Sequence, residues 1–168
     1  ARLISSSWPG VVLLSADAPE RAWDALADAL DAPPPIVVCD DVDRLVGVWG
    51  DVWGRDGAER LEELVRTRRD TTVVLTAHRL TGALVRVADL LPRRAVLRSP
   101  SRAEHIALGG TGESWDPQAP PGRGLLDGKL VQFALAEPTA EPASIARGTG
   151  WRPGMGPTGL VVRGGRRR

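Results

Sequence analysis

Short apolar runs alternate with segments of helical periodicity along most of the chain. The apolar runs are rich in Val, Leu and Ile and are bounded by turn-forming residues, as buried strands are. They are residues 10–14, 36–39, 71–76 and 95–97. The segments in which apolar residues recur at helical spacing are residues 17–30, 58–69, 80–91 and 102–108. This alternation predicts an α/β fold with a largely parallel sheet.

A hairpin is predicted after the last of these helices. Two apolar runs, Gly124 to Leu126 and Leu130 to Leu135, are joined by Asp127-Gly128. Asp-Gly between apolar runs is a strong hairpin signal, because both residues tolerate the positive φ angles of a two-residue turn. We therefore expect an antiparallel hairpin at the edge of the sheet, and an α/β domain that spans residues 1–136. Residues 137–168 are rich in Pro, Gly, Ala and Arg and predict an extended or disordered tail.

The segment 47–57 interleaves four glycines with two tryptophans. This pattern favours a loop or a loosely formed helix start over a strand. Trp49 and Trp53 present an aromatic face to a partner under one interpretation, since tryptophan is enriched at interface anchors. Packing in the core is the alternative. His105 is interpreted as a helix-face residue without a special role.

Composition limits the classes of protein that fit. The chain has 168 residues, of which 42% are hydrophobic and 26% charged, as in one globular domain. Cys39, His78 and His105 are too few for a zinc site with four nitrogen or sulfur ligands. No apolar run approaches the roughly 20 residues that span a bilayer. The chain does not begin with methionine, which suggests a piece of a longer protein.

Charge is distributed unevenly along the chain. Residues 147–168 hold six arginines and no acid, whereas residues 1–146 hold 16 basic and 21 acidic residues, a net charge of −5. The tail that ends in Arg163-Gly164-Gly165-Arg166-Arg167-Arg168 is either a contact for DNA phosphates or anionic lipid, or a solvated end. The acidic body argues against a DNA-coating surface on residues 1–146.

The second predicted strand runs directly into two carboxylates, Asp40 and Asp41. Ligands of open α/β sheets bind at the carboxyl ends of the strands. In P-loop nucleotidases, an acid at such a position holds Mg²⁺ on the phosphates and the next acid polarises the attacking water. A plain junction between strand and loop is the alternative.

A phosphate-binding loop is missing from the sequence. Such a loop needs Gly-x4-Gly-Lys-Ser/Thr, so that backbone N–H groups and one lysine surround the phosphates. Lys129 is the only lysine, and it lies in the predicted hairpin with a leucine where the hydroxyl residue should be. These 168 residues alone are therefore expected to be inactive as a P-loop ATPase.

Residues 36–136 nevertheless resemble the C-terminal half of FtsK/SpoIIIE-type RecA-like motor ATPases. The similarity is closest to actinobacterial members and to the tandem ATPase modules of type VII secretion. The segments that carry it are Asp40-Asp41-Val42-Asp43-Arg44-Leu45, Val73-Val74-Leu75-Thr76-Ala77-His78-Arg79, Pro120-Pro121-Gly122-Arg123-Gly124-Leu125 and the strand Val131-Gln132-Phe133-Ala134. The fold that the resemblance implies is a partial RecA-like P-loop NTPase core.

The resemblance also implies roles for single residues. Asp40 would bind Mg²⁺ through water, and Asp41 would be the catalytic acid. Thr76 and His78 would lie at the nucleotide, with His78 at the phosphate-sensing position. Arg123 is either an arginine finger that reaches a neighbouring subunit or a residue that fixes a turn.

The function implied is an ATP-driven translocase that moves DNA or a secreted protein. Its cofactors would be ATP and Mg²⁺, provided that a phosphate loop lies upstream of Ala1. We expect a homo-oligomer in the cytoplasm or at the inner face of the cell membrane, with membrane association through segments outside this chain. The alternative is a catalytically dead pseudo-ATPase that serves as a regulatory or partner-binding module through Trp49 and Trp53.

Overall fold

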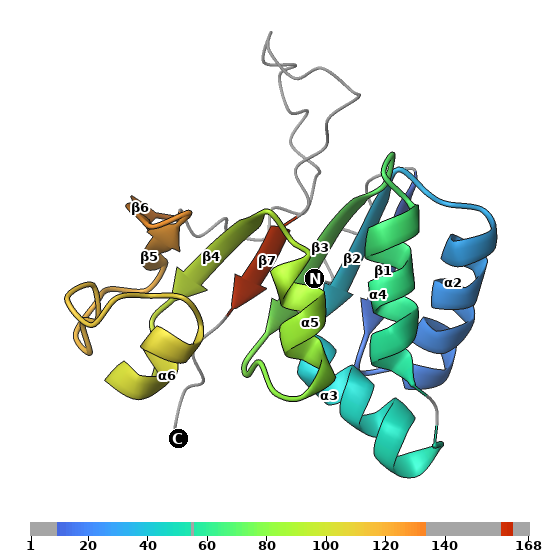
Figure 1. Cartoon of the computed structure of the whole chain (residues 1–168), viewed down its shortest axis with the longest axis horizontal. Coiled ribbons are helices and arrows are strands. Elements are labelled where there is room, and N and C mark those ends of the chain that lie inside the picture. Colours follow the sequence, from blue (N-terminus) through green and yellow to red (C-terminus); the bar gives the residue numbers. More distant parts are fainter. Residues whose placement is uncertain (1–9, 55, 134–158, 163–168) are drawn as a thin grey trace, which may run out of the picture.

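Seven strands form one sheet in a computed structural model of the chain, which describes residues 10–54, 56–133 and 159–162. The order of the strands is β1-β2-β3-β7-β4-β5-β6 (Figure 1). Helices connect the parallel strands, so the predicted α/β class is confirmed.

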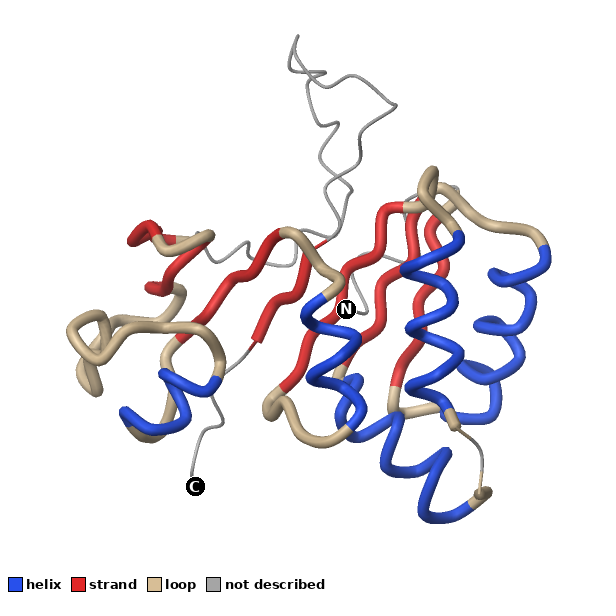
Figure 2. The backbone as a smooth tube through the Cα atoms, in the orientation of Figure 1, coloured by secondary structure: helices blue, strands red, loops and turns tan. Residues whose placement is uncertain are grey.

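The first part of the sheet is parallel. It consists of β1 (Val11–Ser15), β2 (Ile36–Asp40) and β3 (Thr72–Ala77). Helix α2 (Pro19–Asp31) connects the first pair, and α4 (Gly57–Thr67) precedes β3. Both helices lie on the same face of the sheet (Figures 1 and 2). This is expected when the chain advances from strand to strand in one direction through right-handed crossovers.

The other end of the sheet is antiparallel. It consists of β4 (Arg93–Leu97), β5 (Arg123–Leu126) and β6 (Lys129–Gln132). The turn between β5 and β6 has φ angles of 51° at Asp127 and 77° at Gly128, as a two-residue hairpin turn requires. The predicted hairpin is confirmed.

Strand β7 (Gly159–Val162) lies between the two parts. It is parallel to both β3 and β4, with Val162 opposite Ala77 and Val96. This strand falls within residues 137–168, where the sequence predicts an extended or disordered tail, and the rest of that range lies outside the described residues. The chain thus passes from β3 to β4 around the position that β7 fills.

The core lies between the sheet and the helices. Leu14, Val37, Cys39, Val73 and Leu75 alternate along the first three strands and are at most 1% exposed. They meet the apolar stripes of α2 and α4, which are Ala22, Leu26, Ala29 and Leu30 in α2 and Ala58, Leu61 and Leu64 in α4. The alternating apolar residues of the strands therefore face the apolar stripes of the helices, as the sequence patterns predict.

Residues 47–52 of the glycine-rich segment are helical, so for this part the helix is the form that describes it. Helix α3 (Val42–Gly47) continues into the π-helical turn η1 (Val48–Val52). Trp49 is fully buried there, its indole N–H donates to the carbonyl of Pro19 at 2.9 Å, and its ring meets the edge of Trp23 at 5.3 Å. Burial of this one large side chain outweighs the low helix propensity of the surrounding glycines.

Two short helices complete the described residues. Helix α5 (Ala83–Asp89) precedes β4, and α6 (Arg102–Ala107) follows it, with the Ser101 hydroxyl accepting the Glu104 N–H as a cap. None of the described helices has both the length and the hydropathy needed to cross a bilayer.

Candidate functional site

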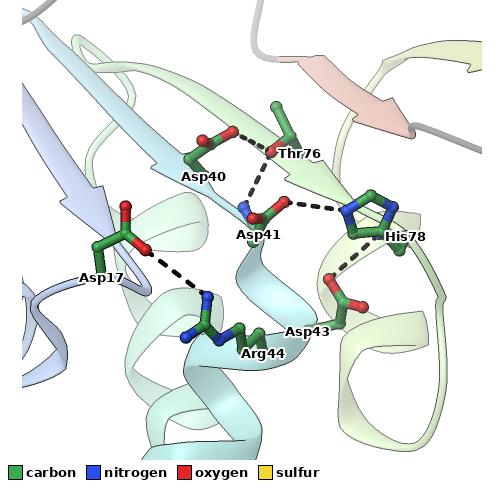
Figure 3. Close-up of polar contacts among 7 residues, drawn as sticks. All are labelled: Asp17, Asp40, Asp41, Asp43, Arg44, Thr76 and His78. Atoms are coloured by element: carbon green, nitrogen blue, oxygen red, sulfur yellow. Dashed lines mark hydrogen bonds and ion pairs between the residues drawn. The ribbon is translucent and has the colours of Figure 1, made fainter. Parts of the chain in front are cut away.

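The carboxyl ends of β1, β2 and β3 bring together polar side chains that are far apart in the sequence. Figure 3 shows that this set includes Asp40 and Asp41 from the end of β2 and Thr76 and His78 from the end of β3. Parallel pairing in register, with Cys39 opposite Leu75, places both strand ends at the same edge. We call Asp40, Asp41, Thr76 and His78 the strand-end cluster. All four were candidate site residues from the sequence.

Thr76 joins the two aspartates. Its hydroxyl donates to a carboxylate oxygen of Asp40 at 2.6 Å and accepts the backbone N–H of Asp41 at 3.0 Å (Figure 3). Thr76 is only 5% exposed, so these bonds are largely shielded from water. A hydrogen bond to a charged group in such surroundings is stronger than one between neutral groups. The orientation of the Asp40 carboxylate is therefore fixed from the neighbouring strand.

Asp41 has an unusual backbone conformation. Its φ of 53° and ψ of 51° are in the left-handed region, which costs free energy for any residue other than glycine. Asp41 is the N-cap of α3, yet its side chain accepts no hydrogen bond from that helix. Its carboxylate instead faces the His78 ring, with Oδ1 and Nε2 3.3 Å apart. The backbone thus holds this carboxylate at the sheet edge rather than in a capping position.

Two further carboxylates lie at the same edge. Asp43 accepts the backbone N–H of His78 at 3.2 Å, which ties α3 to the loop after β3. Asp17, which follows β1, lies 3.7 Å from the guanidinium of Arg44 in an exposed ion pair. Such exposed pairs stabilise a fold by less than about 1 kcal/mol. Neither Asp43 nor Asp17 was a candidate site residue, although Asp43 lies in the segment 40–45 that carries the family resemblance.

The negative charge of this edge acts on the core beneath it. Burial raises the pKa of the Cys39 thiol far above its ordinary value, and Asp40, Asp41 and Asp43 raise it further. Cys39 is fully buried, so it remains a protonated thiol and packs as a small apolar side chain.

The donor set suits Mg²⁺ only in part. Within the part of the chain that the structure describes, no three His, Cys, Asp or Glu side chains are arranged to hold a metal ion by themselves. Mg²⁺ is usually held by one or two carboxylates, several waters and the phosphates of a substrate. Asp40 would supply one such carboxylate, and water and phosphate oxygens would have to supply the other ligands.

Arg123 does not join the cluster. It begins β5, four strand positions from β2 in the sheet, which is about 19 Å at the usual spacing. Gly122, with a φ of 82°, and Gly124, packed against the Val96 carbonyl, form the close turn around it. Within this chain the surroundings of Arg123 are therefore those of a residue that fixes a turn. Its contact with a neighbouring subunit, as an arginine finger, stays a prediction.

The two tryptophans do not form an exposed aromatic face. Trp49 is fully buried, so its indole is not accessible to a partner, and Trp53 is partly buried against the same core. The prediction of a partner-binding role for this pair is wrong for Trp49, and core packing describes it. The Gly57 position shows how tightly the ring is enclosed, because a Cβ there would lie 2.0 Å from Trp49 Cε3.

His105 lies on helix α6, where the sequence predicts a helix-face residue, and it is buried. It is 4% exposed, and its Nε2 lies 2.9 Å from the Ser114 hydroxyl. Its Nδ1 atom is buried without a hydrogen-bond partner. Burial lowers the pKa of His105 below 6.5, so the neutral ring is favoured.

His105 lines a cavity beside α6. The cavity has a volume of about 440 Å³ and lies between α6, the segment 109–122 and the β5–β6 hairpin. Sequence reasoning missed it, because it forms only when the segment 109–122 packs back on β4. Trp115 helps to hold that segment by donating to the Ser99 carbonyl at 3.4 Å.

Comparison with known proteins adds no family assignment to this geometry. No family model, curated protein or solved structure matches the chain.

Proposed function

We propose that the chain is part of an FtsK/SpoIIIE-like ATPase domain of an ATP-driven translocase that moves DNA or protein. The observation that carries this proposal is the bond of the Thr76 hydroxyl to the Asp40 carboxylate and to the Asp41 N–H. It fixes two adjacent acids at the carboxyl end of β2, next to the end of the parallel strand β3. That edge is where open α/β sheets bind their ligands.

Each residue of the cluster has a part in this proposal. Asp40, oriented by Thr76, would hold Mg²⁺ through water, and the ion would neutralise charge on the phosphates. Asp41, whose carboxylate is 32% exposed and is not used for capping, would orient and polarise a water molecule. His78, 3.3 Å from Asp41, would occupy the phosphate-sensing position. The RecA-like P-loop core is part of the same proposal.

The groups that would bind the phosphates must come from outside these residues. The only lysine, Lys129, lies on β6 at the far edge of the sheet from β1, and no Gly-x4-Gly-Lys-Ser/Thr sequence is present. The 168-residue chain should therefore fail to bind MgATP at micromolar concentration. Micromolar binding by this chain alone would contradict the proposed arrangement.

The test uses the coding region on both sides of this segment and the protein that it encodes. A Gly-x4-Gly-Lys-Ser/Thr sequence between a strand and a helix upstream of Ala1 would supply the missing loop. In that protein, Asp41→Asn should abolish ATP turnover. Asp17→Asn is the matched control, because Asp17 is an acid at the same edge and its side chain is 66% exposed.

The salt dependence of binding distinguishes a DNA cargo from a protein cargo. Neutralising DNA phosphates releases counterions, so affinity for DNA falls steeply as salt concentration rises. Capture of a protein segment by apolar contacts is far less sensitive to salt. Binding of the encoded protein to a DNA duplex at increasing salt concentration therefore distinguishes the two cargoes.

A partner-binding pseudo-ATPase is a second candidate. The observation that favours it is the exposure of large apolar side chains on elements away from the strand-end cluster. Ile106 is 51% exposed, Leu130 65% and Phe133 40%, and all three lie on α6 or on the β5–β6 hairpin and its continuation. Loss of partner capture on mutation there, with no ATP turnover by the encoded protein, would select this candidate.

A further inference from the structure

A row of apolar side chains crosses the antiparallel part of the sheet, and its last member, at the sheet edge, is exposed. Val96 of β4 lies opposite Leu125 of β5, and Leu125 lies opposite Leu130 of β6. Residues directly opposite one another share a face of the sheet. Exposure rises along this row, from 2% at Val96 to 6% at Leu125 and 65% at Leu130.

The row forms one wall of the 440 Å³ cavity beside α6. Val96, Leu125 and Leu130 all line it, and Trp115 and His105 line it from the other side. A side chain that lay beside Leu130 on the same face would therefore stand at the mouth of this cavity. It would bury the leucine and extend the row by one position.

The backbone at this edge is also available. β6 pairs with β5 on one side, and no described residue pairs with its other side. An edge strand presents N–H and C=O groups that can bond to another extended chain. Its four residues include one charge, Lys129, so the edge has little of the charge by which edge strands commonly avoid such pairing.

We propose that the β6 edge and the adjoining cavity bind an extended segment of a partner protein, with a large apolar side chain of that segment beside Leu130. The outer edge of β6, with which no described residue pairs, selects a polypeptide, because it offers backbone donors and acceptors. The cavity is lined by Arg98 and Arg123 together with Glu113 and Asp116, a balance of charge that gives nucleic acid no advantage.

A second copy of this chain fits the edge less well. Stable dimers bury roughly 800 Å² on each partner. The free edge is only four residues long, with a single large exposed apolar side chain, Leu130. A peptide needs less area, because its anchor can use the cavity. This proposal concerns a surface on β6 and is independent of the strand-end cluster.

The test titrates the 168-residue chain with a blocked peptide, acetyl-Ser-Val-Thr-Leu-Thr-Val-Ser-amide, while its backbone amide signals are followed by NMR. Saturable shifts should appear at residues 129–132. Leu130→Asp should weaken binding by about tenfold or more, because a carboxylate replaces the apolar contact. Val85→Asp is the matched control, since Val85 is 43% exposed on α5, outside the cavity.

Two further peptides separate the contributions. In one peptide, aspartate replaces the central leucine and should remove the apolar anchor. In the other, N-methylation of alternate backbone nitrogens should remove the pairing with β6. Each change should abolish the shifts. The proposal is overturned by the absence of shifts at millimolar peptide, or by shifts that Leu130→Asp leaves unchanged. It is equally overturned if light scattering shows a dimer of the chain that Leu130→Asp dissociates, because the edge is then occupied by a second copy.

Discussion

The hydroxyl of Thr76 lies 2.6 Å from a carboxylate oxygen of Asp40, although 36 residues separate them in the sequence. The same hydroxyl accepts the N–H of Asp41 at 3.0 Å. One buried side chain therefore orients one acid and fixes the backbone of the next. The proposed site depends on this relationship more than on any single carboxylate.

Thr76→Val should destabilise the fold even though the two side chains have nearly the same shape. The substitution leaves a part-buried N–H and a carboxylate oxygen without their partner, which costs about 1–3 kcal/mol. Urea unfolding followed by circular dichroism measures this loss. Thr76→Ser should recover most of it, and Thr72→Val on the same strand is the control. Equal stability of Thr76→Val and wild type would show that the hydroxyl is not needed.

Asp41→Gly and Asp127→Gly form a matched pair, since both aspartates have φ angles near 50°. Glycine relieves the left-handed conformation but adds freedom to the unfolded chain, and the two effects nearly offset each other. Asp127 also loses bonds from the Arg94 N–H and the Arg93 guanidinium, which lower the pKa of its carboxyl group. Thermal unfolding should therefore show Asp41→Gly within about 1 kcal/mol of wild type and Asp127→Gly clearly less stable. A large loss for Asp41→Gly would mean that its carboxylate serves stability.

Gly57→Ala should destabilise the protein through contact with Trp49. A Cβ at Gly57 would lie 2.0 Å from the buried indole, and such overpacking costs about 1–3 kcal/mol. Gly47→Ala is the control, because Gly47 has helical φ and ψ angles of −59° and −50° and open space around it. It should stabilise the protein by about 0.5–1 kcal/mol. Chemical denaturation of both variants checks the contrast, and equal effects would contradict the packing described.

Stability should fall as pH decreases below about 6.5, because burial holds the pKa of His105 below its ordinary value. Below that pH the His105 ring binds a proton more readily in the unfolded chain than in the folded chain. Above that pH the ring is neutral in both states. One such group changes the unfolding free energy by at most about 1.4 kcal/mol per pH unit. Denaturation at several pH values should show this slope, and His105→Gln should reduce it. A slope unchanged in His105→Gln would assign the effect to other groups.

The elements with strong local signals were predictable from the sequence. Apolar runs such as residues 36–39 form strands because burial on both faces favours β-branched residues. Asp127-Gly128 forms the hairpin turn because both residues accept positive φ. The acids at the end of β2 were found because a strand that ends in carboxylates is visible in the sequence itself.

The features that local signals did not reveal depend on distant contacts. Residues 47–57 fit either a loop or a loosely formed helix start until Trp49 is seen to donate to Pro19, 30 residues away. The position of β7 depends on its pairing with β3 and β4, and its only sequence signal is the short run Leu160-Val161-Val162. The burial of His105 depends on the return of the segment 109–122, which has no periodicity. In each case tertiary packing outweighs local propensity.

The measurement that tests the central claim most directly is ATP turnover by the protein as encoded, with Asp41→Asn compared with wild type and with Asp17→Asn. The proposal predicts turnover in wild type and in Asp17→Asn, and its loss in Asp41→Asn. Turnover that survives Asp41→Asn would contradict the assignment of the strand-end cluster as the catalytic site. A wild-type protein without turnover would contradict the translocase proposal and leave the partner-binding function.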